Sequence, residues 1–244
     1  MIVNAHHLAI AVASRIAFEQ MCQREVLLDE AMIKRTIAEA LQAMTQLRIE
    51  PEYNHPNIPG ATRLDLIGRQ SEDGPIALAI ETKWVKSGGA IRDWQEELAD
   101  DALRLECLDD EMAQQNERLL VICGTHQTIN AKLINKQRNH DGARFNALPH
   151  IASWDPAAAT LPRNQERIGI RDCDLGMQKL WKKCAQSFDG VLPVSYQSAL
   201  LADHRADSRK TCVRAIVWRI NRSRNRSEFT VPQDWTRTQS PRGV

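Results

Sequence analysis

The chain has 244 residues with 43% hydrophobic and 26% charged residues and a net charge of +1, which is the composition of an ordinary soluble protein. This length can bury a sizeable core as one domain, or as one domain with an appendage. The sequence contains no Gly-rich phosphate loop and no nucleotide-binding fingerprint, so it predicts neither a P-loop protein nor a dinucleotide-binding enzyme.

The N-terminus predicts neither a signal peptide nor a membrane span. The apolar segment 8–12 is short, no basic residues precede it, and Arg15 and Glu19 interrupt the apolar pattern after it. The six cysteines show no Cys-x-x-Cys pair and no zinc-binding spacing, so a reducing compartment is the simplest environment. We therefore expect a cytoplasmic protein without a membrane partner.

The first clear helix is predicted over residues 29–48, with Asp29 as its N-cap. Its apolar residues lie three or four positions apart and define one buried stripe: Ile33, Ile37, Leu41 and Met44. At about 100° per residue, Glu30 falls inside this stripe and Glu39 falls on the opposite face. Glu30 is therefore a candidate for an inward-facing acid, although the simpler alternative is that it only favours the helix N-terminus through the macrodipole.

Two apolar segments, 63–68 and 76–84, come after a candidate first strand at 49–53 and are joined by the turn-like sequence 70–75. Side chains alternate across a strand, so Glu81 and Lys83 share one face. A hairpin brings Asp65 beside them. Two carboxylates and one ammonium group in a sheet are costly unless a cation or a phosphate binds there.

Such a group of side chains suits the metal-assisted hydrolysis of a phosphodiester. Two carboxylates and a backbone carbonyl form an oxygen site for Mg²⁺, with Mn²⁺ as a substitute. The metal polarises a phosphoryl oxygen and lowers the pKa of a bound water. The neighbouring lysine can orient or activate that water and stabilise charge.

The spacing of these residues resembles the PD-(D/E)XK nuclease superfamily, which has the restriction-endonuclease-like fold. Fifteen residues separate Asp65 from Glu81, and one separates Glu81 from Lys83. The proline that often precedes the aspartate is absent, and Leu64 takes its place. The resemblance implies that Asp65, Glu81 and the carbonyl of Thr82 bind Mg²⁺. It also implies that Lys83 is catalytic and that a helix acid, here Glu30, assists the metal site.

A second helix is predicted over residues 90–112, after the hairpin. Asp101 lies within its apolar arc and Arg104 at the edge, in an Asp-x-x-Arg-Leu sequence like that of some bacterial members of the superfamily. We interpret these two residues as an i,i+3 ion pair that supports the core and does not touch substrate. Gln95, near the other edge of the arc, is an auxiliary site candidate.

An apolar strand at 118–124, a helix at 130–138 and a short strand at 150–154 complete an α/β pattern. The resemblance covers residues 29–154. It implies a restriction-endonuclease-like core with a central mixed sheet flanked by helices, plus a small C-terminal appendage. We assign residues 1–155 to the core with N-terminal helices, 156–220 to a C-terminal α/β extension packing on it, and 221–244 to a basic, flexible tail.

The C-terminal part contains a loop-like segment at 155–174, a helix at 175–188 and an alternating strand at 213–220. Charge is unevenly distributed along the chain. Residues 86–118 contain four basic and ten acidic residues, whereas residues 205–244 contain ten basic and three acidic residues. The basic segment suits a polyanion such as nucleic acid. It could equally be a solvated tail.

The sequence therefore favours a Mg²⁺-dependent nuclease that acts on nucleic acid, with DNA as the favoured substrate, in bacterial or phage DNA defence or processing. A homodimer is expected if both strands are cut with one site per chain. Two alternatives stay open. One is a catalytically degenerate nuclease fold that acts as a nucleic-acid-binding or regulatory module. The other is a structural protein whose charged strand ends form weak, solvated ion pairs.

Overall fold

The computed structural model describes residues 3–24, 28–58, 62–86, 91–109, 116–131, 165–173, 175–208, 211–222 and 226–236. The helix predicted at 130–138 lies mostly outside these residues, and the strand predicted at 150–154 lies entirely outside them.

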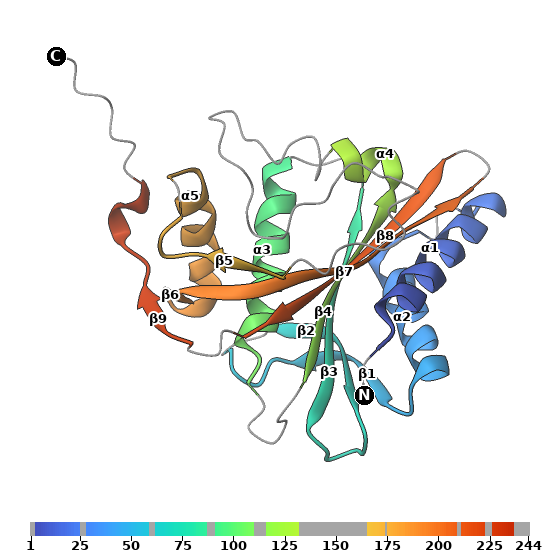
Figure 1. Ribbon diagram of the computed structural model, residues 1–244, viewed down its shortest axis with the longest axis horizontal. Coiled ribbons are helices and arrows are strands. Elements are labelled where there is room, and N and C mark those ends of the chain that lie inside the picture. The colour runs from blue at the N-terminus through green and yellow to red at the C-terminus, as the bar shows by residue number, and fades with distance from the viewer. Residues whose placement is uncertain are drawn as a thin grey trace.

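A mixed sheet of seven strands runs through the centre of the molecule, in the spatial order β1-β2-β3-β4-β8-β7-β5 (Figure 1). Strands β3 and β4 are parallel, and all other neighbouring pairs are antiparallel. The strands of this sheet are β1 (Arg48–Asn54), β2 (Arg63–Arg69), β3 (Ile76–Val85), β4 (Glu117–Thr125), β5 (Gln165–Gly169), β7 (Ser195–Asp207) and β8 (Cys212–Asn221). The predicted α/β class is therefore confirmed.

Helices cover both faces of this sheet. Helices α1 (Ala5–Met21) and α2 (Glu30–Met44) lie on one face, and α3 (Ile91–Cys107) and α5 (Leu175–Cys184) lie on the other (Figure 1). The shorter elements are α4 (His126–Ile129), η3 (Ala185–Phe188) and η4 (Gln233–Thr236). No helix within the described part of the chain is long and apolar enough to cross a membrane.

The sheet has a hydrophobic core on each face because its strand residues alternate. Ile80 and Trp84 of β3 join the core beneath α1 and α2. Ala79 and Val85 join the core beneath α3 and α5. Glu81 and Lys83 lie between Ala79 and Val85 in this alternation, so they face α3.

Helix α2 begins as the sequence predicts. Asp29 is its N-cap, and its carboxylate accepts a hydrogen bond of 2.8 Å from the backbone N–H of Met32. The helix ends at Met44, four residues before the predicted end at Arg48, because Arg48 already begins β1.

The predicted C-terminal extension, residues 156–220, contributes strands to the central sheet. Strands β5, β7 and β8 belong to the same seven-stranded sheet as β1–β4, with β8 paired directly to β4. Strand β5 also lies inside the segment 155–174 that was predicted to be a loop. Its sequence is polar because it is an edge strand: Glu166 and Arg167 are exposed, and Ile168 is its buried contact with the core.

Part of the predicted flexible tail is folded. Strand β9 (Glu228–Thr230) pairs with β6 (Val191–Pro193) in a second, two-stranded sheet, and η4 comes after it. Arg226 forms an ion pair with the buried Glu106. Arg222 forms one with Asp109. These contacts show that part of the basic C-terminal charge neutralises the acidic segment 86–118.

Candidate functional site

The site begins where β2 and β3 separate. Their backbone register runs from the pair Leu66–Ile80 toward the turn. One residue beyond that pair, the Asp65 side chain connects the two strands. Its Oδ2 accepts hydrogen bonds from the backbone N–H of Thr82 at 2.7 Å and from the Thr82 hydroxyl at 2.9 Å. The Asp65 carboxylate is thereby fixed beside the strand that bears Glu81 and Lys83.

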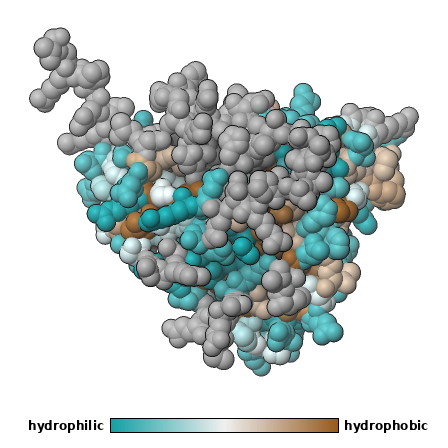
Figure 2. Space-filling model, viewed as in Figure 1, coloured by the Kyte–Doolittle hydropathy of each residue, from teal (hydrophilic) through white to brown (hydrophobic). Residues whose placement is uncertain are grey.

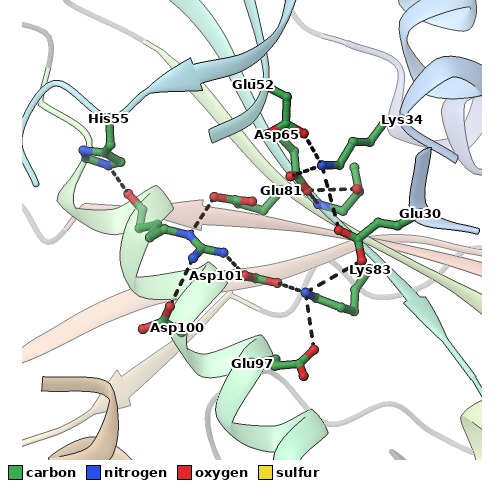
Figure 3. Close-up of polar contacts among 12 residues, drawn as sticks. Glu30, Lys34, Glu52, His55, Asp65, Glu81, Lys83, Glu97, Asp100 and Asp101 are labelled. Carbon is green, nitrogen blue, oxygen red and sulfur yellow. Dashed lines mark hydrogen bonds and ion pairs between the residues drawn. The ribbon is translucent and has the colours of Figure 1, made fainter. Parts of the chain in front are cut away.

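The second oxygen of Asp65 meets a lysine from α2. Lys34 Nζ lies 2.7 Å from Asp65 Oδ1 and 2.5 Å from Glu52 Oε1 (Figure 3). Glu30, one turn earlier on the same helix, lies 3.9 Å from Lys34. The pKa of Lys34 is raised: burial alone would lower it, but its contacts with Asp65 and Glu52 outweigh burial. Lys34 is therefore a permanent cation among three acids.

Glu81 is held by α3 on the other side of the site. Its side chain is only 2% exposed, and its Oε1 accepts a hydrogen bond of 2.9 Å from Arg104 Nε. Arg104 also pairs with Asp100 at 3.1 Å and with Asp101. His55 fixes the same turn of α3. Its Nδ1 accepts from the backbone of Asn57, so Nε2 carries the proton and donates to the Arg104 carbonyl at 2.8 Å.

Lys83 points into the same group of side chains from β3 (Figure 3). Its Nζ lies 3.4 Å from Glu97, 3.6 Å from Asp101 and 3.9 Å from Glu30. Burial would lower the pKa of Lys83, but these surrounding carboxylates raise it above its ordinary value. Lys83 therefore stays protonated, which favours a role in orienting water and stabilising negative charge over a role as a base.

The site contains more acids than bases. Ion pairs connect three cations, Lys34, Lys83 and Arg104, to seven carboxylates: Glu30, Glu52, Asp65, Glu81, Glu97, Asp100 and Asp101. In Figure 2, hydrophilic residues gather near the middle of the described part of the face that Figure 1 shows. The polar side chains of Figure 3 come from both helix layers and from β1–β3.

Burial changes the protonation of two acids in this site. Burial, followed by the negative charge of Asp101, raises the pKa of Glu81 well above its ordinary value, and Arg104 only partly offsets the effect. Burial also raises the pKa of Asp101 to about 6, against the opposing effects of Lys83 and Arg104. The buried Oδ2 of Asp101 has no hydrogen-bond partner among the described residues. A further cation would relieve this imbalance.

The structure brings together the predicted residues Asp65, Glu81, Lys83 and Glu30. Glu30 is partly exposed, at 38%. Its carboxylate nevertheless meets Lys34 and Lys83. The side chain of the remaining candidate, Gln95, lies outside the described residues.

Asp101 and Arg104 form the predicted ion pair. They do more than support the core, because Asp101 contacts Lys83 and Arg104 contacts Glu81. Within the described residues, no group of three or more acidic, histidine or cysteine side chains is arranged to hold a metal ion.

Sequence reasoning missed Lys34 and Glu52. A signal for Lys34 existed, because it is four residues after Glu30 and so lies on the same side of α2. Glu52 carried no such signal. Its backbone has φ of 54° inside β1, a left-handed conformation that a sequence pattern of a strand does not predict.

Known proteins supply no further guide. Neither a protein-family model, nor a curated protein, nor a solved structure matches this chain. Function is therefore inferred from the geometry and charge of the site.

Proposed function

We propose that the protein is a Mg²⁺-dependent nuclease that hydrolyses phosphodiester bonds in nucleic acid, with DNA as the favoured substrate. The observation that carries the proposal is the excess of carboxylates over cations around two buried acids of raised pKa, Glu81 and Asp101. Buried acids of raised pKa that depend on a specific charged neighbour are characteristic of functional sites. A divalent cation would supply the missing positive charge.

The chemistry of the candidate donor atoms suits Mg²⁺. Asp65 and Glu81 come from the neighbouring strands β2 and β3, and hard divalent cations prefer oxygen ligands. Asp65 and Glu81 would hold the ion, together with the carbonyl of Thr82. Mn²⁺ would substitute for Mg²⁺ with the same ligands. When bound, the ion would polarise a phosphoryl oxygen and lower the pKa of a coordinated water.

The other residues of the site would act on the substrate and on that water. Lys83 is a fixed positive charge, held by Asp101, Glu97 and Glu30. It would orient the attacking water and stabilise negative charge on the phosphorane-like transition state. Glu30 reaches the same space from the first turn of α2, so it is positioned to bind a water ligand of the ion.

The arrangement of the elements supports a restriction-endonuclease-like core for this proposal. A helix, α2, precedes strands β1, β2 and β3, and α3 and β4 come after them. The acids lie where β2 and β3 diverge, with the lysine one strand residue beyond Thr82. This order agrees with the α-β-β-β-α-β order expected from the resemblance to the superfamily.

A second candidate function is a catalytically degenerate nuclease fold that binds nucleic acid or a regulatory partner. The observation that favours it is the occupation of the proposed ligand oxygens by protein cations. Lys34 contacts Asp65 Oδ1, and Arg104 contacts Glu81 Oε1. If these pairs persist in the presence of metal, the site binds no cation and cleaves nothing.

Cleavage assays with plasmid and single-stranded DNA in Mg²⁺ or Mn²⁺ separate the two candidates. The nuclease proposal expects cleavage that EDTA abolishes. Asp65→Asn, Glu81→Gln and Lys83→Ala should each lower the cleavage rate by about 100-fold or more. Without metal, Glu81→Gln should leave the thermal midpoint unchanged or slightly raised, because it relieves repulsion with Asp101. Asp65→Asn should lower it slightly, because it loses the ion pair with Lys34. Metal-independent binding of DNA without cleavage would favour the degenerate candidate.

RNA in the same assay tests the preference for DNA. The ratio of linearised to nicked plasmid, measured over a range of protein concentrations, tests whether a homodimer cuts both strands.

A further inference from the structure

Lys34 lies against Asp65, one of the two carboxylates that the proposed function assigns to Mg²⁺. Its ammonium group lies 2.5 Å from Glu52, 2.7 Å from Asp65 and 3.9 Å from Glu30. No other described lysine contacts Asp65 through an ion pair. The Lys34 side chain is 18% exposed, so solvent and ions can reach it.

The two oxygens of Asp65 have different tasks. Oδ2 accepts both hydrogen bonds from Thr82, which tie β2 to β3 where the strands diverge. Oδ1 is the oxygen that Lys34 contacts. A metal ion that uses Asp65 without breaking the connection between the strands must therefore bind Oδ1, and to do so it must displace Lys34.

Glu52 keeps Lys34 close to this position. Residue 52 lies between Pro51 and Tyr53, which pair with Leu66 and Leu64 of β2. Its left-handed backbone, with φ of 54°, interrupts an otherwise regular strand, and its carboxylate makes the shorter of the two close contacts with Lys34. When Lys34 leaves Asp65, Glu52 and Glu30 remain as its partners on the rim of the site.

We propose that Lys34 is an internal counter-ion that neutralises Asp65 in the metal-free protein, and that it sets the affinity of the site by having to be displaced when a divalent cation binds. This inference rests on the proposed function, because it takes Asp65 as a metal ligand. Asp65 and Glu81 would provide the affinity for the metal ion, and Lys34 would lower it. It also explains how the protein keeps two acids close together before metal arrives.

The test is a Mg²⁺ titration of the full chain, followed by calorimetry and by the thermal midpoint, with no nucleic acid present. Lys34→Met removes the competing charge and keeps a straight side chain suited to a helix. We expect Mg²⁺ to bind at least about tenfold more tightly than to the wild type, because one positive charge in contact with the ligand oxygen is lost. The metal-free variant should have a lower thermal midpoint, which Mg²⁺ should raise more than it raises that of the wild type.

Three variants serve as matched tests. Arg35→Met changes the exposed neighbour of Lys34 on the same helix and should bind Mg²⁺ as the wild type does. Lys34→Arg keeps the positive charge and should stay close to the wild-type affinity. Lys34→Gln can still donate a hydrogen bond to Glu52, so it provides a neutral variant for the case in which Lys34→Met does not fold without metal.

The outcomes separate this inference from the proposed function. Equal or weaker Mg²⁺ binding by Lys34→Met and Lys34→Gln, with clear binding by the wild type, would overturn the role of Lys34 and leave the nuclease proposal intact. Binding by the neutral variants alone would support the counter-ion role and assign the native chain to the degenerate candidate. The absence of binding by wild type and variants alike would overturn both.

Discussion

Two networks of charged side chains lie in the core of this protein, and they differ in the ratio of positive to negative charges. In the first, Arg214 on β8 is fully buried and pairs with Asp203 on β7 through Nε at 2.7 Å and through Nη2. Its Nη1 donates to Asn130 at 2.9 Å. In the second, the site on β1, β2, β3, α2 and α3, ion pairs connect three cations to seven acids.

The comparison shows that burial alone does not distinguish structural from functional charges. Arg214 and Asp203 neutralise each other, and each forms directed hydrogen bonds, so this pair needs no ligand. Glu81 and Asp101 are also buried, and burial raises their pKa values more than the neighbouring cations lower them. The balanced pair stabilises the fold, whereas in the second network carboxylates outnumber cations, and our proposal is that a bound cation offsets this difference.

The largest effect on stability is expected at the balanced pair. Arg214→Met should lower the free energy of unfolding by about 3–5 kcal/mol, because it leaves the Asp203 carboxylate buried without its partner. Denaturant unfolding measures this change. Arg48→Met removes an exposed ion pair with Glu72 and should change stability by less than about 1 kcal/mol.

The double variant Arg214→Met/Asp203→Leu checks the cause of that loss. It should recover most of the stability, since neither charge remains. A double variant as unstable as Arg214→Met would show that packing of the arginine side chain, and not its charge, holds β7 and β8 together.

A smaller, pH-dependent effect is expected at Asp101. Its pKa is raised to about 6 in the folded protein, above the ordinary value near 4. Between about pH 4 and pH 6, the folded protein therefore binds a proton that the unfolded chain has released. The stability from this group is fully present below about pH 4 and is lost as the pH rises through about 6.

Asp101→Asn should remove this dependence. Each pKa unit corresponds to about 1.4 kcal/mol, so the metal-free wild type should lose on the order of 2–3 kcal/mol relative to Asp101→Asn between about pH 4 and pH 7. Unfolding curves of both proteins across this range provide the measurement. Parallel pH profiles would mean that folding does not raise the pKa of Asp101, and that its charge is neutralised as it is in the pair of Arg214 and Asp203.

The smallest effect is expected at the edge of the site. Glu30→Gln removes a partly exposed acid that lies 3.9 Å from both Lys34 and Lys83, so Mg²⁺ affinity should fall by about tenfold or less. Glu39→Gln removes an exposed acid from the same helix and should leave the affinity unchanged. If the two variants behave alike in a Mg²⁺ titration, Glu30 does not assist the metal site.

Local patterns in the sequence were enough to find the centre of the site. Strands β2 and β3 have nearly their predicted bounds, and their alternation places Glu81 and Lys83 on one face. The N-cap Asp29 and the ion pair between Asp101 and Arg104 were also predicted. Each of these features depends on residues a few positions apart or on one short hairpin, where spacing and propensity determine geometry.

The wider architecture could not be found in this way. Strand β7, which has 13 residues, was not predicted, and β8 was assigned to an extension although it pairs with β4 in the middle of the sheet. Strand β4 ends at Thr125, and its partner β8 begins only at Cys212. Strand pairing over such a distance depends on which apolar faces can be buried together, and periodicity within one segment contains no information on that choice.

The sequence by itself determined which residues carry charge, and that Asp65, Glu81 and Lys83 lie on two neighbouring strands. Only the tertiary structure decided which charges neutralise one another. It placed Lys34 on Asp65, Arg104 on Glu81 and Arg226 on Glu106. The reason is physical: a charge acts on its neighbours in space, and its pKa depends on burial and on those neighbours. Both the burial of a group and its charged neighbours are set only when distant segments of the chain pack together.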